Sequence, residues 1–506
     1  MKKALTTALL AAALLLSGST LAQTLIVAQG TDAVTLDAAN STDSPSATVI
    51  SHISETLFEL TPEGTIEPLL AESQEVSEDG RVWTLNLRQG VTFHDGTPFD
   101  AEAVVFNLER FIDPENAFQF RFLLARIESV EATDEHTVEV TLADTFAPFL
   151  AHLTHSSTAI QSPAAIQTQG DDYGDNPVGT GPFRFVSWER GQRIDLERND
   201  DYWGEAPGVE GVRFLTVPES TTRMAMVETG EAHVAVRVPV QDVSRLDADP
   251  NITVDNTSSV RTIYIYFNHT MEPFTDARVR QAINYAVDKE EIADFLLGGA
   301  VRPSDAPIAP GIFGYTPVGS YDYNPERARE LLAEAGHPDG LSVTLYSPSG
   351  RYLQDIQISE AIQSQLAEVG VNAEIESLEW AAYLELTGQP AEDNIVPMAM
   401  LGWGTVTGDA DYGLFALFHT SEHVPAGSNR AFYSNPEVDE LLDEARTDTD
   451  PETREGLYAE AMQIIWDEAA WLFLHSETQL TAIRDEVEGF VVHPTERYLA
   501  HNASLR

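Results

Sequence analysis

The sequence contains no cysteine among its 506 residues. This absence excludes disulfide bonds, thiolate metal ligands and cysteine nucleophiles together. It also excludes a lipoprotein anchor, because that anchor is attached to a cysteine directly after the signal sequence. We therefore expect a chain that is held together by packing, hydrogen bonds and ion pairs alone.

Basic residues are scarce. The chain has 29 Lys and Arg against 81 Asp and Glu, a formal net charge of −52, and Lys289 is the only lysine after residue 3. Nucleic acid is excluded as an expected partner, because binding to phosphates requires a basic surface. Self-repulsion among so many carboxylates is screened by salt, so the composition suggests a saline habitat.

Long apolar runs are also missing. The longest is Ala4 to Leu16, which follows Lys2 and Lys3 and precedes small residues up to Ala22. This pattern predicts a secretory signal peptide over residues 1–22, cleaved after Ala22. The run is too short to cross a membrane. We expect an exported, periplasmic protein without a lipid anchor.

Two short motifs suggest sites that their context does not support. Gly179-Thr-Gly181 is followed by Pro182 and a strand-like segment, whereas a phosphate loop opens a helix. His152 and His155 have no third ligand at a spacing that zinc requires. The sequence also lacks a Gly-x-Ser-x-Gly elbow and a His-Glu-x-x-His motif. We predict no metal, no cofactor and no catalytic residue.

Local patterns in the first half predict α/β structure. Gln23–Gln29 reads as a first strand, Ser44-Pro45 opens a helix, and Val82–Leu87 alternates as a half-buried strand. Asp100 is expected to cap the helix that follows it.

The second half predicts a parallel βαβ unit. Leu341–Tyr346 is a strand, Asp355–Val369 a helix and Val371–Ile375 another strand. Pro397 lies in the apolar segment that leads to Trp403, so that strand is expected to be broken or at a sheet edge.

The stretch Met400–Leu414 is the predicted ligand site. It reads as the end of a strand, a Gly/Thr loop and the start of a helix, and such loops usually carry ligands in α/β sheets. Trp403 and Tyr412 offer aromatic surface, and Asp409 and Asp411 offer carboxylates for an ammonium group. The alternative is a solvated loop in which Trp403 packs in the core and the aspartates cap the next helix.

The order of motifs along the chain resembles the family 5 extracellular solute-binding proteins of ABC importers, which include dipeptide-, oligopeptide-, nickel- and glutathione-binding proteins. The resemblance rests on Glu78–Arg88, Gly90–Phe99, Ala101–Arg110, Asn176–Phe183, Asn199–Trp203, Met226–His233 and Pro273–Ala282. Gly402-Trp403, Thr407–Tyr412 and Ala431–Asn435 are most similar to the glutathione-binding branch.

This resemblance implies a periplasmic binding protein of type II, with two α/β lobes that close like a Venus flytrap and an extra inserted domain. We expect lobe I to comprise residues 23–53, 166–266 and 478–506. The inserted small domain is expected over 54–165 and lobe II over 267–477.

The resemblance also implies ligand-binding residues. Related dipeptide-binding proteins carry an ammonium-binding Asp where this chain has Val406, which moves that role to Asp409 or Asp411. Arg351 lies near the position of their carboxylate-anchoring arginine, and Arg261 is a second candidate. For both arginines the alternative is an ion pair with the protein's own carboxylates.

Thr31, at the end of the first strand, is expected to contact the ligand from the opposite lobe. One Asp and two Arg would match the charges of glutathione, which has one ammonium and two carboxylates.

Three functions remain open. The first is a monomeric periplasmic binding protein that captures glutathione or a short peptide and delivers it to an ABC permease. The second keeps this role with a metal chelate, sugar or opine-like solute as cargo. The third is a secreted hydrolase or chaperone, and release of amino acids from a peptide would establish it.

Overall fold

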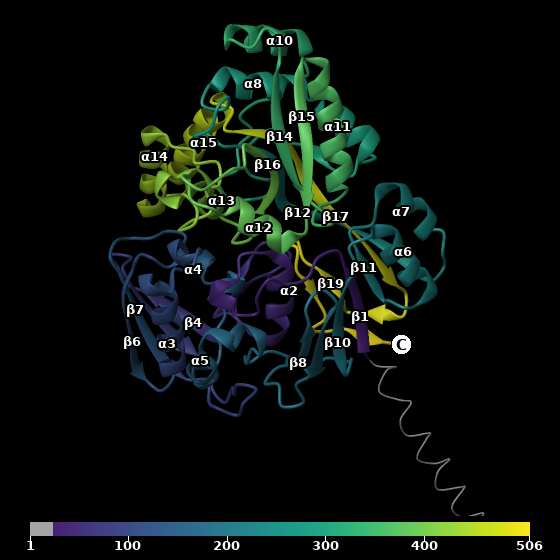
Figure 1. Cartoon of the computed structure of the whole chain (residues 1–506). Coiled ribbons are helices and arrows are strands. Elements are labelled where there is room, and N and C mark those ends of the chain that lie inside the picture. The colour runs from purple at the N-terminus through teal and green to yellow at the C-terminus, as the bar shows by residue number, and fades with distance from the viewer. Residues whose placement is uncertain (1–23) are drawn as a thin grey trace, which may run out of the picture.

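The computed structural model describes residues 24–506, so the predicted signal peptide lies outside the described residues. One mixed sheet organises the chain (Figure 1). Its strands follow the order β15-β14-β16-β12-β17-β11-β1-β10-β9-β8, and β13 pairs with β17 beside this path. Helices pack around the two ends of this sheet, which are the two lobes.

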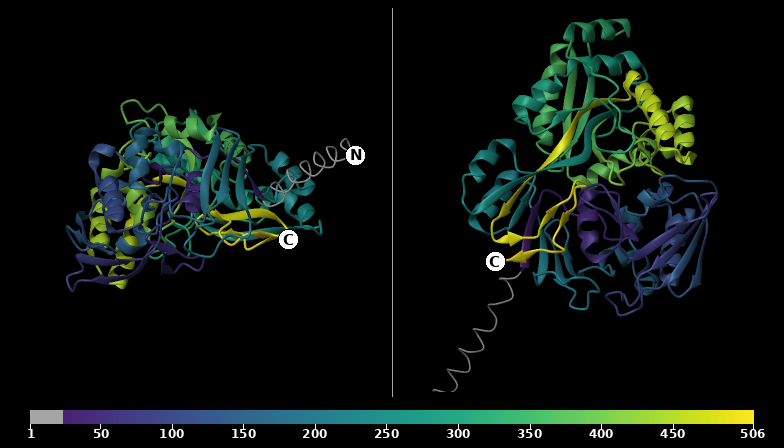
Figure 2. Two further views of the ribbon diagram at one scale, coloured as in Figure 1. Left: turned by 90° about the horizontal axis from the view of Figure 1, so that it is seen from below. Right: turned by 180° about the vertical axis from the view of Figure 1, so that it is seen from behind.

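Two long antiparallel strands join the lobes. They are β12 (Ile252–Phe267) and β17 (Trp471–Arg484), which pair from one end to the other. Figure 2 shows the yellow β17 passing from one lobe into the other. The ladder shifts register between Ser258 and Thr262, so Ser259, Val260 and Arg261 lie opposite Glu477 without regular partners on β17.

The first lobe contains β1 and its neighbours. Its strands are β1 (Thr24–Gln29), β8 (Phe183–Glu189), β9 (Arg193–Arg198), β10 (Gly211–Thr216) and β11 (Val234–Val236), and its helices are α2 (Ser44–Ile53), α6 (Ser220–Thr229) and α7 (Val240–Leu246). The C-terminal segment adds β18 (Val487–Glu488), β19 (Val491–Val492), β20 (Tyr498–Leu499) and β21 (Ser504–Leu505). The predicted first strand is thus confirmed.

The cap of α2 differs from the prediction by one residue. Asp43, not Ser44, is the N-cap and accepts a hydrogen bond from the Ser46 amide. A carboxylate at this position satisfies an otherwise unpaired amide of the first turn. The Ser44 hydroxyl is thereby free for other contacts.

A small domain lies beside the first lobe. It contains the antiparallel sheet β4-β5-β7-β6 and the pair β2-β3. Its elements are β2 (Phe58–Leu60), β3 (Ile66–Pro68), β4 (Ala71–Val76), β5 (Val82–Leu87), β6 (Ile127–Asp134), β7 (Thr137–Leu142), α3 (Ala101–Ile112), α4 (Phe149–His152) and α5 (Pro163–Gln169). Asp100 caps α3 as predicted.

The second lobe carries the predicted βαβ unit. Strands β14 (Leu341–Pro348) and β15 (Val371–Leu378) pair in parallel, with α11 (Asp355–Glu368) between them in sequence. The remaining elements are β13 (Arg302–Pro303), β16 (Met398–Gly404), α8 (Ala277–Ala286), α9 (Lys289–Glu291), α10 (Pro325–Glu334), α12 (Trp380–Thr387), α13 (Ala410–Phe418), α14 (Pro436–Thr447) and α15 (Pro451–Asp467).

The expectation for Pro397 was wrong. Strand β16 begins at Met398, directly after the proline, and lies between β14 and β12 rather than at an edge. The missing N–H of Pro397 therefore costs no ladder hydrogen bond, while its carbonyl accepts one from the Asn268 amide at 2.9 Å.

The apolar cores show how the parts meet. Buried side chains of the small domain form one cluster with those of the second lobe and with Met224, Ala235 and Leu246 of the first lobe. The remaining buried side chains of the first lobe form a separate cluster around Leu25, Val27 and Phe214. Small domain and second lobe are thus packed against each other. Among residues 24–506, no helix has the length and apolar character needed to cross a membrane.

Candidate ligand-binding cavity

A cavity of about 80 Å³ lies where the two lobes and the small domain meet. The N-terminal turn of α2 forms one side, and the loop after β16 forms the other. Trp403 and Tyr412, both predicted from the sequence, line this cavity, and Val406 lines it too. The strand–loop–helix segment therefore reaches the junction of the lobes.

Aromatic side chains form one wall of the cavity. The ring centroids of Trp403 and Tyr412 are 4.9 Å apart, and Phe120 of the small domain lies edge-on to both at 5.8 Å. A 3.0 Å hydrogen bond joins His155 Nε2 and the Tyr412 hydroxyl. Burial lowers the pKa of His155 to about 3, so this imidazole is neutral and adds no charge to the wall.

Asp409 does not line the cavity. It caps α13 by accepting a hydrogen bond from the Asp411 amide, and its carboxylate pairs with Arg454 of α15 at 2.8 Å. Burial raises the pKa of Asp409, while Arg454 opposes that rise. Of the two roles considered for Asp409 from the sequence, ligand binding and helix capping, the structure shows helix capping.

Asp411 is also directed away from the cavity. Its side chain is fully buried and lies 3.0 Å from Arg446 Nε and 3.1 Å from His152 Nε2. Burial alone would raise the pKa of Asp411, but Arg446 and His152 hold it below its ordinary value. Because His152 belongs to the small domain, this carboxylate joins that domain to the second lobe. The geometry thus supports neither aspartate as the ammonium partner.

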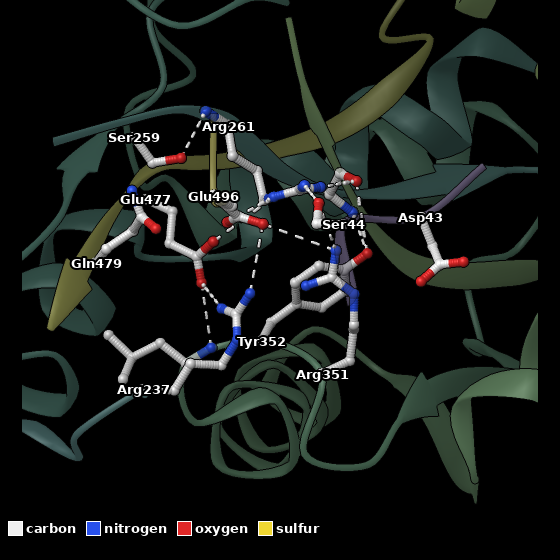
Figure 3. A network of polar contacts seen from close by, with 12 residues as sticks. Asp43, Ser44, Arg237, Ser259, Arg261, Arg351, Tyr352, Glu477, Gln479 and Glu496 are labelled. Atoms are coloured by element: carbon white, nitrogen blue, oxygen red, sulfur yellow. Dashed lines mark hydrogen bonds and ion pairs between the residues drawn. The ribbon is translucent and has the colours of Figure 1, made fainter. Parts of the chain in front are cut away.

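Arg261 of β12 lies at the cavity, but each of its three guanidinium nitrogens already has a polar partner within the protein. Its Nε is 2.7 Å from Glu496 Oε1, its Nη2 donates to Ser44 Oγ at 2.7 Å, and its Nη1 donates to the Gly402 carbonyl (Figure 3). Arg261 therefore forms an ion pair within the protein, which is the alternative considered from the sequence.

The carboxylates of Glu477 and Glu496 hold a second arginine, Arg237. Its guanidinium lies 2.8 Å from Glu477 and 3.4 Å from Glu496. Burial raises the pKa of Glu477 to about 7. The pKa of Glu496 lies well below its ordinary value, because Arg261 and Arg237 outweigh the effect of its burial.

Arg351, in the loop after β14, is held more weakly. Its Nη2 donates to Ser44 Oγ at 3.3 Å and lies 3.7 Å from Glu496, while Nε and Nη1 are buried without a partner among the described residues. Burial lowers its pKa. Together with Arg237 and Arg261 it brings three positive charges to two carboxylates. At least one positive charge is left over, on a guanidinium that lines the cavity.

Three further charged residues line the cavity and were missed in the sequence. Asp43 is the only carboxylate on the described wall, and it accepts hydrogen bonds from the Ser46 amide and hydroxyl. Arg430 and Arg497 also line the wall, and neither forms an ion pair within residues 24–506. Burial raises the pKa of Asp43 and lowers that of Arg497 to about 10.

The sequence held only weak signals for these three residues. Asp43 belongs to an Asp-Ser-Pro helix start, and Arg430 directly precedes the Ala431–Asn435 motif. Thr31 is near the site but not in it. It lines a separate cavity of about 20 Å³, together with Ser44, Arg351 and Glu496.

Comparisons with known proteins agree with this architecture. A family model for bacterial extracellular solute-binding proteins, family 5, matches residues 65–423. The glutathione-binding protein of Pectobacterium atrosepticum is 34% identical over 464 residues, which cover 91% of this chain and 90% of the relative.

Two solved structures are similar over nearly the whole chain. One is the ABC transporter-associated periplasmic binding protein DppA of Helicobacter pylori in complex with the peptide STSA, at 30% identity and a TM-score of 0.88, covering 95% of this chain and 98% of that one. The other is the dipeptide-binding protein of Pseudoalteromonas sp. SM9913 in complex with Met-Leu, at 25% identity and a TM-score of 0.90, covering 96% and 100%.

The fold is the mixed α/β fold of periplasmic binding proteins, with additional small antiparallel sheets. The family binds solutes and does not catalyse reactions, which confirms the expectation that this protein is not an enzyme. The chain therefore belongs to the family 5 extracellular solute-binding proteins and is the substrate-binding component of an ABC importer for peptide-like solutes.

Proposed function

We propose that this protein captures glutathione in the cavity between its lobes and delivers it to the permease of an ABC importer. The relative from Pectobacterium is a glutathione-binding protein. The charges that line the cavity support the same cargo independently of that likeness.

The charge balance of the cavity wall is the observation that carries this proposal. Arg261 is neutralised by Glu496, which leaves Arg351, Arg430 and Arg497 facing a single carboxylate, Asp43. The rest of the protein is strongly acidic, so this excess of positive charge is local. Glutathione has two carboxylates and one ammonium, whereas a plain dipeptide has one of each. A cavity with an excess of arginine favours the ligand with the extra carboxylate.

The groups of glutathione can be assigned to this wall. One carboxylate pairs with Arg351, whose Nε and Nη1 have no other partner in the described chain. The second pairs with Arg430 or Arg497. The ammonium is placed next to Asp43, because Val406 has no charge to offer at the position that binds it in related dipeptide-binding proteins. The central cysteinyl residue then packs against Trp403.

The protein is proposed to act as an exported monomer. Closure of the lobes removes the ligand from water, and burying an ion pair requires that each charged end has its counter-charge. The residue ranges predicted for the two lobes and the small domain remain predictions. Cleavage of the signal peptide after Ala22 also remains a prediction.

Calorimetric titration of the ligand-stripped mature protein tests the cargo. Reduced glutathione, a dipeptide and a neutral tripeptide are compared at moderate and high salt. We expect heat at about micromolar affinity for glutathione and much weaker binding of the other two. Equal affinity for all three peptides would contradict the charge argument, and silence with all three would reject glutathione as cargo.

The alternative cargo is an opine-like solute, that is, a sugar-derived chain joined to an amino acid. The same observation favours it, since such a molecule with two carboxylates also matches the excess of arginine. An opine-type diacid included in the titration distinguishes the two cargoes.

A further inference from the structure

Two glutamates and three arginines form one buried cluster behind the ligand cavity (Figure 3). Glu477 lies on the crossing strand β17, and Glu496 lies on the segment between β19 and β20. Arg261 is 2.7 Å from Glu496 and 3.8 Å from Glu477, and Arg237 is 2.8 Å from Glu477 and 3.4 Å from Glu496. Each of these two arginines therefore contacts both carboxyl groups, which brings the carboxyl groups themselves close together.

Glu477 has one carboxyl oxygen that is free to carry a proton. Its Oε1 accepts hydrogen bonds from Arg237 at 2.8 Å and from the Leu353 amide at 3.2 Å. Its Oε2 is buried and has no hydrogen-bond partner among the described residues. A proton on Oε2 lets Glu477 donate a hydrogen bond to Glu496. Two buried carboxyl groups so close together also resist being ionised at the same time.

The other charged and titratable groups of the cluster keep one state near neutral pH. Burial raises the pKa of both tyrosines that face it, so they are neutral, and His475 on β17 is neutral because burial lowers its pKa to about 3. Burial raises the pKa of Glu477 to about 7, so Glu477 is the group that titrates. Its charged and titratable neighbours from other elements are Arg237 after β11, Arg261 on β12, Arg351 and Tyr352 after β14, and Glu496 and Tyr498 at β20.

The arginines connect this cluster to the ligand cavity. Arg261 and Arg351 line that cavity, and Arg351 lies 3.7 Å from Glu496, whereas Glu477 does not line it. The two carboxyl groups carry two negative charges when both are ionised and only one when Glu477 holds a proton. A proton on Glu477 therefore adds one positive charge directly behind the wall that faces the ligand.

We propose that Glu477 takes up a proton from solvent when an anionic ligand binds, although the ligand does not touch this residue. The inference rests on the proposed function, in which a ligand carboxylate pairs with Arg351. That carboxylate brings a negative charge to the cluster and makes the ionised form of Glu477 less favourable. By linkage, the ligand binds more tightly when Glu477 is protonated. Glu477 is thus a positioning residue, because it acts through Glu496 and the arginines.

The size of the effect follows from the titration of one group. Without ligand the pKa of Glu477 is about 7. A rise of about one unit on binding gives an uptake of about half a proton per ligand at pH 7.5. The uptake becomes small at pH 6 and at pH 9. The same rise makes binding up to about tenfold tighter at pH 6 than at pH 9.

Calorimetric titration with glutathione in buffers of different ionisation enthalpy, such as Hepes and Tris, counts the protons taken up. The proteins are the wild type, Glu477→Gln and the control Glu55→Gln. Glutamine has the shape of a protonated glutamic acid and still donates a hydrogen bond to Glu496. Glu477→Gln should therefore lose the proton uptake and bind at pH 8.5 about as tightly as the wild type does at pH 6.

Glu55 is a matched control, because burial raises its pKa to about 7 as well, but it lines a different cavity. Glu55→Gln should therefore keep the proton uptake of the wild type. A proton that is exchanged by the ligand itself appears equally with all three proteins. The difference between the wild type and Glu477→Gln thus belongs to Glu477.

A wild type that takes up no proton at any pH between 6 and 9 would overturn the inference, and this measurement needs no variant to fold. Equal uptake by the wild type and a folded Glu477→Gln protein would also overturn it, while binding of glutathione in either case leaves the proposed cargo intact. If glutathione gives no heat, but an opine-type diacid binds with a proton uptake that Glu477→Gln abolishes, the cargo is rejected and the inference is supported.

Discussion

The variant Arg351→Gln should lose ligand affinity without losing stability. The wild-type guanidinium is buried, and its hydrogen-bond and ion-pair contacts among residues 24–506 are Ser44 at 3.3 Å and Glu496 at 3.7 Å. It also lies over the rings of Tyr352 and Trp380, at 4.7 and 5.0 Å from their centroids. Burying an ion without a close counter-charge costs several kcal/mol. Removing this charge should therefore leave the free energy of unfolding of the ligand-free protein unchanged or raise it by about 1–2 kcal/mol.

Ligand binding should respond in the opposite direction. Without Arg351 a ligand carboxylate is enclosed next to an uncharged amide, and removing one partner of a buried charged pair costs about 2–5 kcal/mol. The lower limit corresponds to about thirtyfold weaker binding. Calorimetric titration with glutathione measures this loss.

The neighbouring Arg261 is a matched control. In Arg261→Gln, Glu496 loses the guanidinium at 2.7 Å, and Ser44 and the Gly402 carbonyl lose their donors. Breaking a buried ion pair in this way costs about 3–5 kcal/mol of stability. The two substitutions remove the same chemical group from neighbouring positions. Opposite effects on the free energy of unfolding would therefore result from one difference, namely that Arg261 has a close carboxylate and Arg351 has none.

Urea unfolding of the ligand-free proteins, followed by tryptophan fluorescence, gives the comparison of stability. The slope of each transition should be reported with its midpoint, because a changed slope indicates loss of cooperativity between lobes. An Arg351→Gln protein that is destabilised as much as Arg261→Gln and still binds glutathione with wild-type affinity would contradict this prediction.

Three further predictions concern stability. Asp411→Asn and Asp409→Asn leave Arg446 and Arg454 without their carboxylates, so each should lower the free energy of unfolding by about 3 kcal/mol. The urea midpoint should fall accordingly, and unchanged midpoints would contradict the pairing described. Burial raises the pKa of Glu55 from 4.5 to about 7, so the folded protein keeps a proton that the unfolded chain releases in this range. Stability contributed by this group is full below pH 4.5 and falls by about 3 kcal/mol as the pH rises to 7, and Glu55→Gln should reduce that fall in urea titrations at several pH values. The net charge of −52 predicts a higher unfolding midpoint in molar salt than at low ionic strength, and equal midpoints would argue against self-repulsion.

Local patterns in the sequence were sufficient for the framework. The first strand, the cap at Asp100, the βαβ unit and the loop after β16 follow from periodicity and turn residues, and each is present. These features depend on neighbours in the chain. The order of motifs then identified the family, because it extends over almost the whole length.

The charged residues of the site could not be assigned in the same way. Asp409 and Asp411 were predicted to bind an ammonium group, but their partners, Arg454 and Arg446, come from the next two α-helices, α15 and α14. Only the packing of α13 against α14 and α15 decides that these aspartates face inward. In so acidic a sequence, nothing local distinguishes a carboxylate that is paired from one that is free.

The same reason explains the residues that were missed. Asp43, Arg430 and Arg497 belong to three separate segments and meet only when the lobes are assembled. Arg261 and Arg351 were equal candidates in the sequence. Their difference arises from Glu496, which lies 2.7 Å from the one and 3.7 Å from the other.

The position of β17 has a consequence for the order in which the molecule can assemble. This strand lies in the middle of the large sheet, between β12 and β11, yet it is near the end of the sequence. Glu477 on β17 and Glu496 after it are also the carboxylates that neutralise Arg261 and Arg237. During synthesis the two halves of the sheet therefore lack both their shared strand and their counter-charges until almost the whole chain has been made.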